Sequence, residues 1–249
     1  MTEPDPAARR LADKMREDIQ SGALREGTKL PSIAKLAEEH GIGRGATEHA
    51  LSILRGEGWV MSRRGSGFYV AKQFARIRRV SPDRLDPKLR AQGKMIQDHD
   101  TGDRWRAVNP LVADVVPPPD VAEALGVEPG TVVLSRLRRF KVDGRFVQLS
   151  VSYLPTDLTR GTRIEHSSPG PGGIHGVLAE LGYEPTRYEE RLIGRAPRPT
   201  EVEGLELRSV GAMVLEITRL AWSGERCVEV NRMVLDAEAY EVVYKFPAP

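Results

Sequence analysis

The stretch from Leu30 to Val70 constrains the fold of this chain more than any other part of the sequence. It contains a short helical pattern that begins after Ser32, a glycine-rich break at His40–Gly43, and a second helical pattern from about Arg44 to Arg55. Ser32 can cap the first of these helices, because its hydroxyl can accept a hydrogen bond from a free backbone N–H. The spacing therefore predicts two short helices that are joined by a tight turn.

The second helical pattern has two faces of different chemistry. One face is mainly apolar and the other carries small and polar side chains. The first face comprises Thr47, Ala50, Leu51 and Leu54, and the second comprises Gly45, Glu48, His49 and Ser52. Polar groups on an exposed helix face can hydrogen-bond to base edges. Because glycine costs about 1 kcal/mol relative to alanine inside a helix, Gly45 indicates a close approach to something, most simply a phosphate backbone.

A β-hairpin is predicted directly after this helix. Two short apolar segments, 59–61 and 68–70, flank an Arg-Arg-Gly-Ser-Gly sequence whose glycines suit a tight turn. Arg63 and Arg64 lie beside a tip that is small enough to enter a minor groove. Hairpins of any function use a glycine-rich turn, but this one follows a helix-turn-helix pattern and carries two arginines. Together these features predict a winged helix-turn-helix that contacts DNA.

Charge is unevenly distributed along the chain. The formal net charge is +2, but residues 1–80 contain 15 Lys and Arg against 10 Asp and Glu, which gives +5 and leaves −3 for the remainder. A basic N-terminal third is typical of a nucleic-acid-binding module, although uneven surface charge alone would look the same. The single cysteine, Cys227, excludes an internal disulfide framework and fits a reducing compartment. The polar, proline-broken start does not resemble a signal peptide and no run approaches the roughly 18 apolar residues of a membrane span, so we expect a cytoplasmic protein without a membrane partner.

Residues 76–106 have few apolar anchors, and we expect them to form an extended linker between domains at 1–75 and 107–249. Within this linker His99 lies between Asp98 and Asp100. These three side chains could bind a metal ion, but a solvated polar loop is the simpler interpretation. The other histidines show no ligand spacing, so we expect no metal site and no cofactor.

The second half of the sequence contains an internal repeat. An offset of 80 residues places Pro117, Pro119, Glu123, Leu125, Arg139 and Gly144 over Pro197, Pro199, Glu203, Leu205, Arg219 and Gly224. Each copy is predicted to form a strand, a short helix (121–125 and 201–205), a long strand (131–141 and 212–222), a tight turn and a returning strand. A helix at 174–181 and a strand near 188–193 lie between the copies. Two hairpins with helices against one face make an antiparallel α+β domain, and the seam between the copies is a natural place for a pocket.

The motifs of the N-terminal part resemble those of the GntR family of bacterial transcription regulators. The resemblance covers residues 11–70 and is carried by Leu-Pro-Ser, Gly-Ile-Gly-Arg, Glu-Gly-Trp and Arg-Arg-Gly-Ser-Gly-Phe-Tyr-Val. Ala34 and Ala46 depart from the usual pattern, and Glu48 stands where an arginine is usual. A carboxylate at this position can accept a hydrogen bond from cytosine and shift base preference. The residues expected to contact DNA are Ser32, Lys35, Arg44, Gly45, Glu48, His49, Arg63, Arg64, Gly65, Ser66 and Gly67.

The C-terminal half resembles the UTRA effector-binding domain of the HutC-type branch of that family, which has the chorismate lyase fold. This resemblance runs from about Ala107 to Phe246. It implies an effector site lined by Arg136, Arg138, Ser152, His175, Glu229 and Tyr240. Where the family has a second arginine, this chain has Phe140, and Gly173 and His175 start the central helix. A strand arginine that merely pairs with a carboxylate such as Glu229 remains an alternative for Arg138.

Two classes of function are consistent with this α+β sequence. The first is a DNA-binding regulator, a repressor, that acts as a homodimer on a two-fold symmetric double-stranded operator and responds to a small-molecule effector. The second is an enzyme, because the C-terminal part resembles a lyase fold and a fold does not determine function. The sequence shows no nucleophile with an adjacent base and no phosphate-binding loop, so we predict no catalytic residues. A DNA-bending protein without an effector is disfavoured by the pocket-forming duplication.

Overall fold

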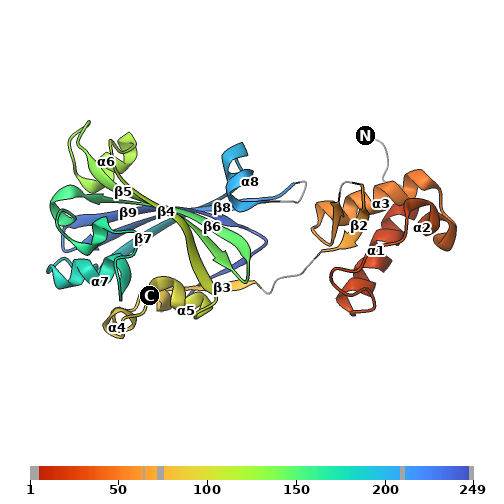
Figure 1. The fold of residues 1–249 in the computed structure, drawn as a ribbon, viewed down its shortest axis with the longest axis horizontal. Coiled ribbons are helices and arrows are strands. Elements are labelled where there is room, and N and C mark those ends of the chain that lie inside the picture. The colour runs from red at the N-terminus through yellow and green to blue at the C-terminus, as the bar shows by residue number, and fades with distance from the viewer. Residues whose placement is uncertain (1–5, 64, 72–75, 208–210, 247–249) are drawn as a thin grey trace. The chain divides into compact units, whose positions relative to one another are not determined.

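The computed structural model describes residues 6–63, 65–71, 76–207 and 211–246. Apart from residues 207–212, the chain divides into two compact units between Ala75 and Arg76. The order of helices and strands is drawn in Figure 1. The fold is mixed helix and sheet, as the sequence predicts.

The first unit is a small bundle of three helices, α1 (Pro6–Gln20), α2 (Ile33–His40) and α3 (Arg44–Gly56). Its core is formed by the apolar stripe of α1 against the buried face of α3, which includes Leu51 and Leu54. The hydroxyl of Ser32 caps α2 by accepting a hydrogen bond of 3.2 Å from the backbone N–H of Lys35. Gly41 ends α2 with a φ of 61°, a left-handed conformation that glycine adopts without strain. The predicted helices and their turn are therefore confirmed.

The hairpin after α3 consists of β1 (Val60–Arg63) and β2 (Gly67–Val70), paired antiparallel with Arg63 opposite Gly67. Lys29 forms an isolated antiparallel bridge with Tyr69, so the segment before α2 lies along the other edge of β2. The hairpin is thereby fixed to the helical core at its base. This is the wing that the sequence predicts.

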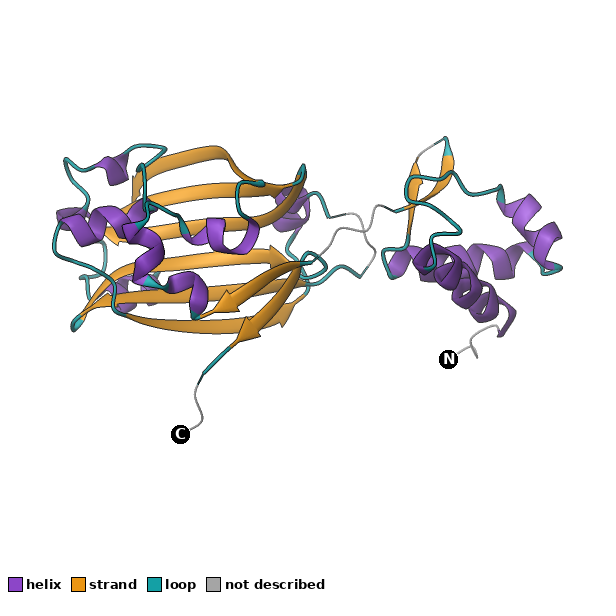
Figure 2. Ribbon diagram, turned by 90° about the horizontal axis from the view of Figure 1, so that it is seen from below, coloured by secondary structure: helices purple, strands orange, loops and turns teal. Residues whose placement is uncertain are grey.

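The second unit is built on a six-stranded antiparallel sheet in the order β4-β5-β6-β9-β8-β7. Its strands run over the following ranges: β4 Trp105–Val115, β5 Val133–Val142, β6 Arg145–Pro155, β7 Arg187–Arg195, β8 Val214–Ser223 and β9 Arg226–Asp236. A separate parallel pair is formed by β3 (Ile77–Ser81) and β10 (Tyr240–Tyr244). Figure 2 views the sheet with helices crossing in front of it.

The sheet consists of two similar halves, as the internal repeat predicts. Each half has the order strand, short helix, strand, strand, and the last strands of the halves, β6 and β9, pair at the centre. The short helices, α6 (Pro119–Leu125) and α8 (Pro199–Leu205), start 80 residues apart. The strands that follow, β5 and β8, start at residues 133 and 214, which is 81 residues apart. The connection after α8 is one residue longer, so an offset of 80 misaligns the strands by one position.

Helices cover both faces of the sheet, whereas we expected them on one face. Helix α6 packs with Val133 and Val230 on one side, while α7 (Gly173–Glu180) packs with Leu134 and Val228 on the other. Neighbouring residues of a strand point to opposite faces, so alternate apolar positions form two separate cores. Figure 1 shows α6 and α8 on one side of the sheet and α4, α5 and α7 on the other.

The expected linker at 76–106 has regular structure. It contains β3, a 3-10 turn (Asp83–Leu85), α4 (Pro87–Ala91), α5 (Ile96–Thr101) and the first residues of β4. The prediction of an extended segment was wrong because much of its anchoring is ionic. Arg84 forms a buried ion pair with Asp100 at 2.6 Å, and Arg79 forms another with Glu190 of β7. Such residues look like surface positions in a sequence.

Candidate DNA-reading and effector sites

The exposed face of α3 has the composition that the sequence predicts. Thr47, Ala50, Leu51 and Leu54 are buried, and Arg44, Gly45, Glu48 and His49 are exposed. No atom of the described chain lies within 4 Å of a Cβ placed on Gly45, so internal packing does not explain this glycine. Arg44 and Glu48 form an ion pair of 3.2 Å along the helix. The carboxylate therefore partly neutralises the cation that is best placed on this face.

Among the described residues of the wing, one arginine, Arg63, lies near the tip. The guanidinium of Arg63 lies 4.4 Å from the centre of the Tyr69 ring, and the hydroxyl of Tyr69 lies 2.6 Å from that of Ser66. Gly65 and Gly67 have positive φ angles of 71° and 104°, as the turn requires. Ser32 and Lys35 lie at the start of α2 and are exposed. Arg64, also expected to contact DNA, lies outside the described residues.

A buried polar cluster lies between α7 and the sheet of the second unit. On its sheet side, Ser150 and Ser152 of β6 face Asn231 of β9, whose side-chain amide donates to both hydroxyls at 3.2 and 2.6 Å. All three side chains are almost fully buried. They form a polar floor across the seam between the halves of the sheet, where we expected a pocket.

A chain of hydrogen bonds crosses this floor from helix to sheet. Nε2 of His175 lies 2.7 Å from Oε2 of Glu229, and Arg219 donates to the same oxygen at 3.2 Å. The hydroxyl of Tyr188 lies 3.3 Å from Nδ1 of His175, and Arg90 of α4 donates to that hydroxyl at 3.2 Å. Because an ionised carboxylate can only accept, Nε2 of His175 carries the proton and Nδ1 accepts from Tyr188.

The ionisation of the cluster follows from its burial. Burial, together with the nearby cations Arg219 and Arg90, lowers the pKa of His175 despite the neighbouring Glu229, so the imidazole is neutral. Burial alone would raise the pKa of Glu229, but His175 and Arg219 hold it well below its ordinary value. The cluster therefore contains one carboxylate, and that carboxylate is already bonded to His175 and Arg219.

Arg138 is the cation of this cluster that has no carboxylate partner. Its guanidinium donates to the hydroxyl of Ser152 at 3.1 Å. Its Nε is buried without a hydrogen-bond partner, and no ion pair joins it to any carboxylate of the described chain. Burial lowers its pKa. The alternative of a strand arginine that simply pairs with Glu229 does not match this geometry, because Arg219 takes that role.

Two of the residues expected in the effector site are engaged with other partners, although Arg136 lies opposite Ser152 in the sheet. Arg136 donates to the backbone carbonyls of Ile164, His166 and Ser167, so it anchors the segment before α7, and burial lowers its pKa to about 10. Tyr240 of β10 donates to the side chain of Gln148 at 3.4 Å and belongs to the core beneath β3. The structure brings together Arg138, Ser152, His175 and Glu229.

Sequence reasoning missed four further members of the cluster, namely Ser150, Arg219, Asn231 and Tyr188. Arg219 was detectable in principle, because an offset of 81 places it over Arg138. Asn231 and Tyr188 gave no signal, since single polar residues in predicted strands are common.

The residues around His99 lie within the short helix α5 and do not form a solvated loop. Asp98 accepts from the backbone N–H of Met95 at 2.7 Å and from the indole of Trp105 at 2.6 Å, and Asp100 pairs with Arg84. The two carboxylates thus have structural partners. Within the described ranges, no group of three His, Cys, Asp or Glu residues could hold a metal ion.

Acidification is expected to destabilise the second unit through His175. The unfolded chain takes up a proton as the pH falls through the ordinary histidine pKa of 6.5, whereas the folded chain, with its lowered pKa, does not. The free energy of unfolding should therefore fall below about pH 6.5. It should fall again as the pH passes below 4.5, the ordinary value for Glu229. His175→Gln should show a smaller loss of thermal stability between about pH 7.5 and 5.5. An identical loss in the variant would contradict this assignment.

Comparison with known proteins identifies both units. The profile of the bacterial regulatory proteins of the gntR family matches residues 7–70, and that of the UTRA domain matches residues 110–241. The chain belongs to the GntR family. It is 33% identical to an uncharacterised HTH-type transcriptional regulator of Streptomyces coelicolor over 86% of this chain and 82% of that protein. A regulator of the same type from Rhizobium meliloti is 27% identical over 84% of this chain and 81% of its own length.

Solved structures agree with this assignment. The crystal structure of a GntR-family transcriptional regulator matches 98% of this chain and 99% of its own, with 26% identity and a TM-score of 0.64. PhnF from Mycobacterium smegmatis has the same fold, with 20% identity, a TM-score of 0.55 and coverage of 96% and 100%. The protein is thus a transcriptional regulator with an N-terminal DNA-binding domain and a C-terminal effector-binding domain, and the UTRA domain fits the HutC-type branch. Every helix in the described ranges is too short or too polar to cross a lipid bilayer.

Proposed function

We propose that this GntR-family regulator is a repressor that reads a two-fold symmetric operator as a homodimer, and that a small anionic effector alters its affinity for that operator. The exposed face of α3 and the wing arginine Arg63 would contact the DNA. The effector would bind at the polar cluster beneath α7. The effector can change the affinity for DNA only to the extent that it binds one conformation of the protein more tightly than the other.

The observation that carries the proposal is the partly buried guanidinium of Arg138, which has no carboxylate partner among the described residues. Burying a charge without an opposite charge is costly, and the one carboxylate of the cluster is already bonded to His175 and Arg219. A carboxylate or phosphate group on a ligand would supply the missing charge and accept hydrogen bonds from Arg138.

The test begins with an operator selected from random oligonucleotides by the full-length protein. A library of small carboxylates and phosphate esters is then screened for compounds that change operator affinity. Arg138→Met should bind the operator as well as the wild type and lose the response to any active compound. A variant that responds as the wild type does would show that the effector binds elsewhere.

Glu48→Gln is expected to raise operator affinity severalfold. It removes a carboxylate that repels phosphate and releases Arg44 from its ion pair. Glu17→Gln, at an exposed position on α1, makes the same change in net charge away from α3 and serves as the control. Binding is measured by fluorescence anisotropy at fixed salt, and equal effects of the two variants would show only a general charge effect. Glu48→Arg should also select a different sequence if this position contacts bases.

A further inference from the structure

Three cations lie together on the strands β4 and β5, on the face of the sheet opposite to the effector cluster. Arg106 of β4 pairs directly with Lys141 of β5, and Arg139 lies two positions before Lys141 on the same strand. All three side chains therefore point to the same face. The residues next to them, Trp105 and Val142, point to the other face and belong to the core there. We call Arg106, Arg139 and Lys141 the cationic face.

The charges of the cationic face are not balanced within the second unit. No carboxylate of the described chain forms an ion pair with any of its three members. Arg106 donates instead to the backbone carbonyls of Asp103 and Trp105. The carboxylate of the adjoining turn, Asp143, is bonded to Arg104 at 2.8 Å. Like charges that face each other across two strands destabilise a sheet, so the folding of the unit does not explain these cations.

The side chain of Phe146 fixes two members of the cationic face. Its ring is almost fully buried. The guanidinium of Arg139 lies 3.7 Å from the centre of this ring, and the ammonium of Lys141 lies 4.1 Å from it. Nε of Arg139 also donates to the backbone carbonyl of Gly204 at 3.0 Å, which leaves both Nη nitrogens without a hydrogen bond to another described residue. Donors that are held in place in this way suit a partner that carries phosphate groups.

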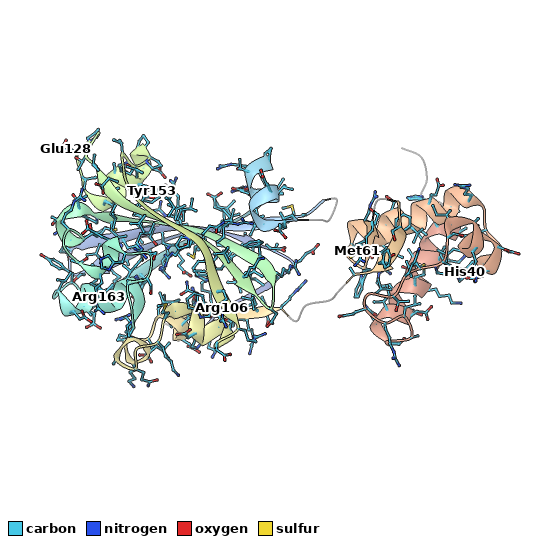
Figure 3. All side chains as sticks on the ribbon, viewed as in Figure 1. His40, Met61, Arg106, Glu128, Tyr153 and Arg163 are labelled. Atoms are coloured by element: carbon cyan, nitrogen blue, oxygen red, sulfur yellow. The ribbon has the colours of Figure 1, made fainter. Side chains whose placement is uncertain are left out.

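The cationic face lies at the end of the sheet where the chain enters the second unit. Ile77, next to the first residue of that unit, Arg76, packs in one core with Val142. Figure 3 labels Arg106 at this end, beside the start of β3. Residues 72–75 connect Arg76 to the wing, and a chain of this length reaches at most about 18 Å. The phosphate-bearing partner that this connection keeps close is the DNA bound by the first unit.

We propose that the cationic face binds the DNA backbone beside the operator, so that the second unit adds phosphate contacts of its own to those of α3 and the wing. Such contacts carry no sequence information, but they raise the affinity and its dependence on salt. The inference requires DNA binding by the first unit and does not depend on the effector.

The length of the DNA tests this inference on the full-length protein. One duplex ends at the outer edges of the selected operator, and a second extends it by about ten base pairs, one helical turn, on each side. The wild type should bind the longer duplex about tenfold more tightly, and this affinity should fall more steeply with salt. Equal affinities would overturn the inference and leave the DNA-reading surface of the first unit intact. Failure to bind either duplex would overturn both.

The double variant Arg106→Ala and Lys141→Ala should lose the preference for the longer duplex. Its affinity for the operator alone should remain that of the wild type. With the longer duplex, each lost phosphate contact should lower the slope of log affinity against log salt by about 0.9. The matched control, Lys88→Ala and Arg191→Ala, makes the same change in net charge at exposed positions on α4 and on β7, the strand at the other edge of the sheet. A preference that persists in the first variant, or an equal loss in the control, would contradict the inference.

Arg106→Glu distinguishes a binding role from a structural one. The new carboxylate would face Lys141 across the strands, so the thermal stability of the second unit should stay the same or rise. The affinity for the longer duplex should nevertheless fall about tenfold or more, because repulsion of phosphate replaces attraction. Circular dichroism on heating and fluorescence anisotropy measure the two quantities. A variant that keeps the wild-type preference for the longer duplex would overturn the inference.

Discussion

Replacing Arg44 and Arg63 together with alanine is expected to weaken operator binding about a hundredfold. Both side chains are exposed, one at the start of α3 and the other on the wing beside Tyr69. Each provides a cation for phosphate or base contacts, and the loss of one such contact typically costs about tenfold in affinity. The fall of affinity with salt should also become less steep, because fewer counterions are released.

A matched control variant distinguishes the loss of DNA contacts from the loss of net charge. Arg10 and Arg25 are exposed at other places in the same unit, and their double alanine variant has the same net charge as the Arg44 and Arg63 variant. Both proteins are compared by titration on the selected operator at several salt concentrations. If the control loses as much affinity as the test variant, α3 and the wing are not the DNA-reading surface.

Arg79→Met is expected to destabilise the second unit by about 3–5 kcal/mol. Arg79 and Glu190 are both buried, with a hydrogen bond of 3.0 Å from Nη1 to Oε2. Removing the arginine leaves the carboxylate of Glu190 buried without its partner. This lowers the free energy of unfolding by more than the intact ion pair had contributed to it. Arg79 lies on β3, so this ion pair attaches the start of the unit to β7 of the main sheet.

Two variants test the cause of that effect. Arg78→Met removes the neighbouring exposed arginine, whose ion pair with Glu241 is solvent-accessible, and should cost at most about 1 kcal/mol. The double variant Arg79→Met and Glu190→Leu should recover most of the lost stability, because no charge then remains buried. Urea unfolding followed by tryptophan fluorescence measures all three. A double variant as unstable as Arg79→Met would show that packing of the arginine, and not its charge, holds β3.

The elements of the fold that were predictable from sequence are those with a local signal. The periodicity of α1 and α3, the cap at Ser32 and the glycines of the wing each specify backbone conformation within a few residues. The duplication was visible because proline, glycine and apolar positions repeat along the chain. Its alignment was wrong by one residue in the strands, because a single inserted residue between α8 and β8 leaves no trace in a fixed offset.

The effector cluster was only partly predictable for a physical reason. Arg138, Ser152, His175 and Glu229 were expected from a resemblance, but their mutual arrangement depends on four separate segments, β5, β6, α7 and β9. Which arginine takes the carboxylate is decided by strand register and not by residue type. Tyr240 has the right chemistry and lies over another part of the core, because β10 pairs with β3.

The sequence by itself therefore determined that the protein has a winged helix-turn-helix and a duplicated antiparallel sheet, since these depend on local periodicity and turn residues. Only the tertiary structure decided that residues 76–106 are held by buried ion pairs, because the partners of those arginines become neighbours after folding. It also decided that Arg219 donates its hydrogen bond to Glu229, which leaves Arg138 without a carboxylate partner. That outcome follows from the packing of α7 on the sheet and the register of β8 against β9.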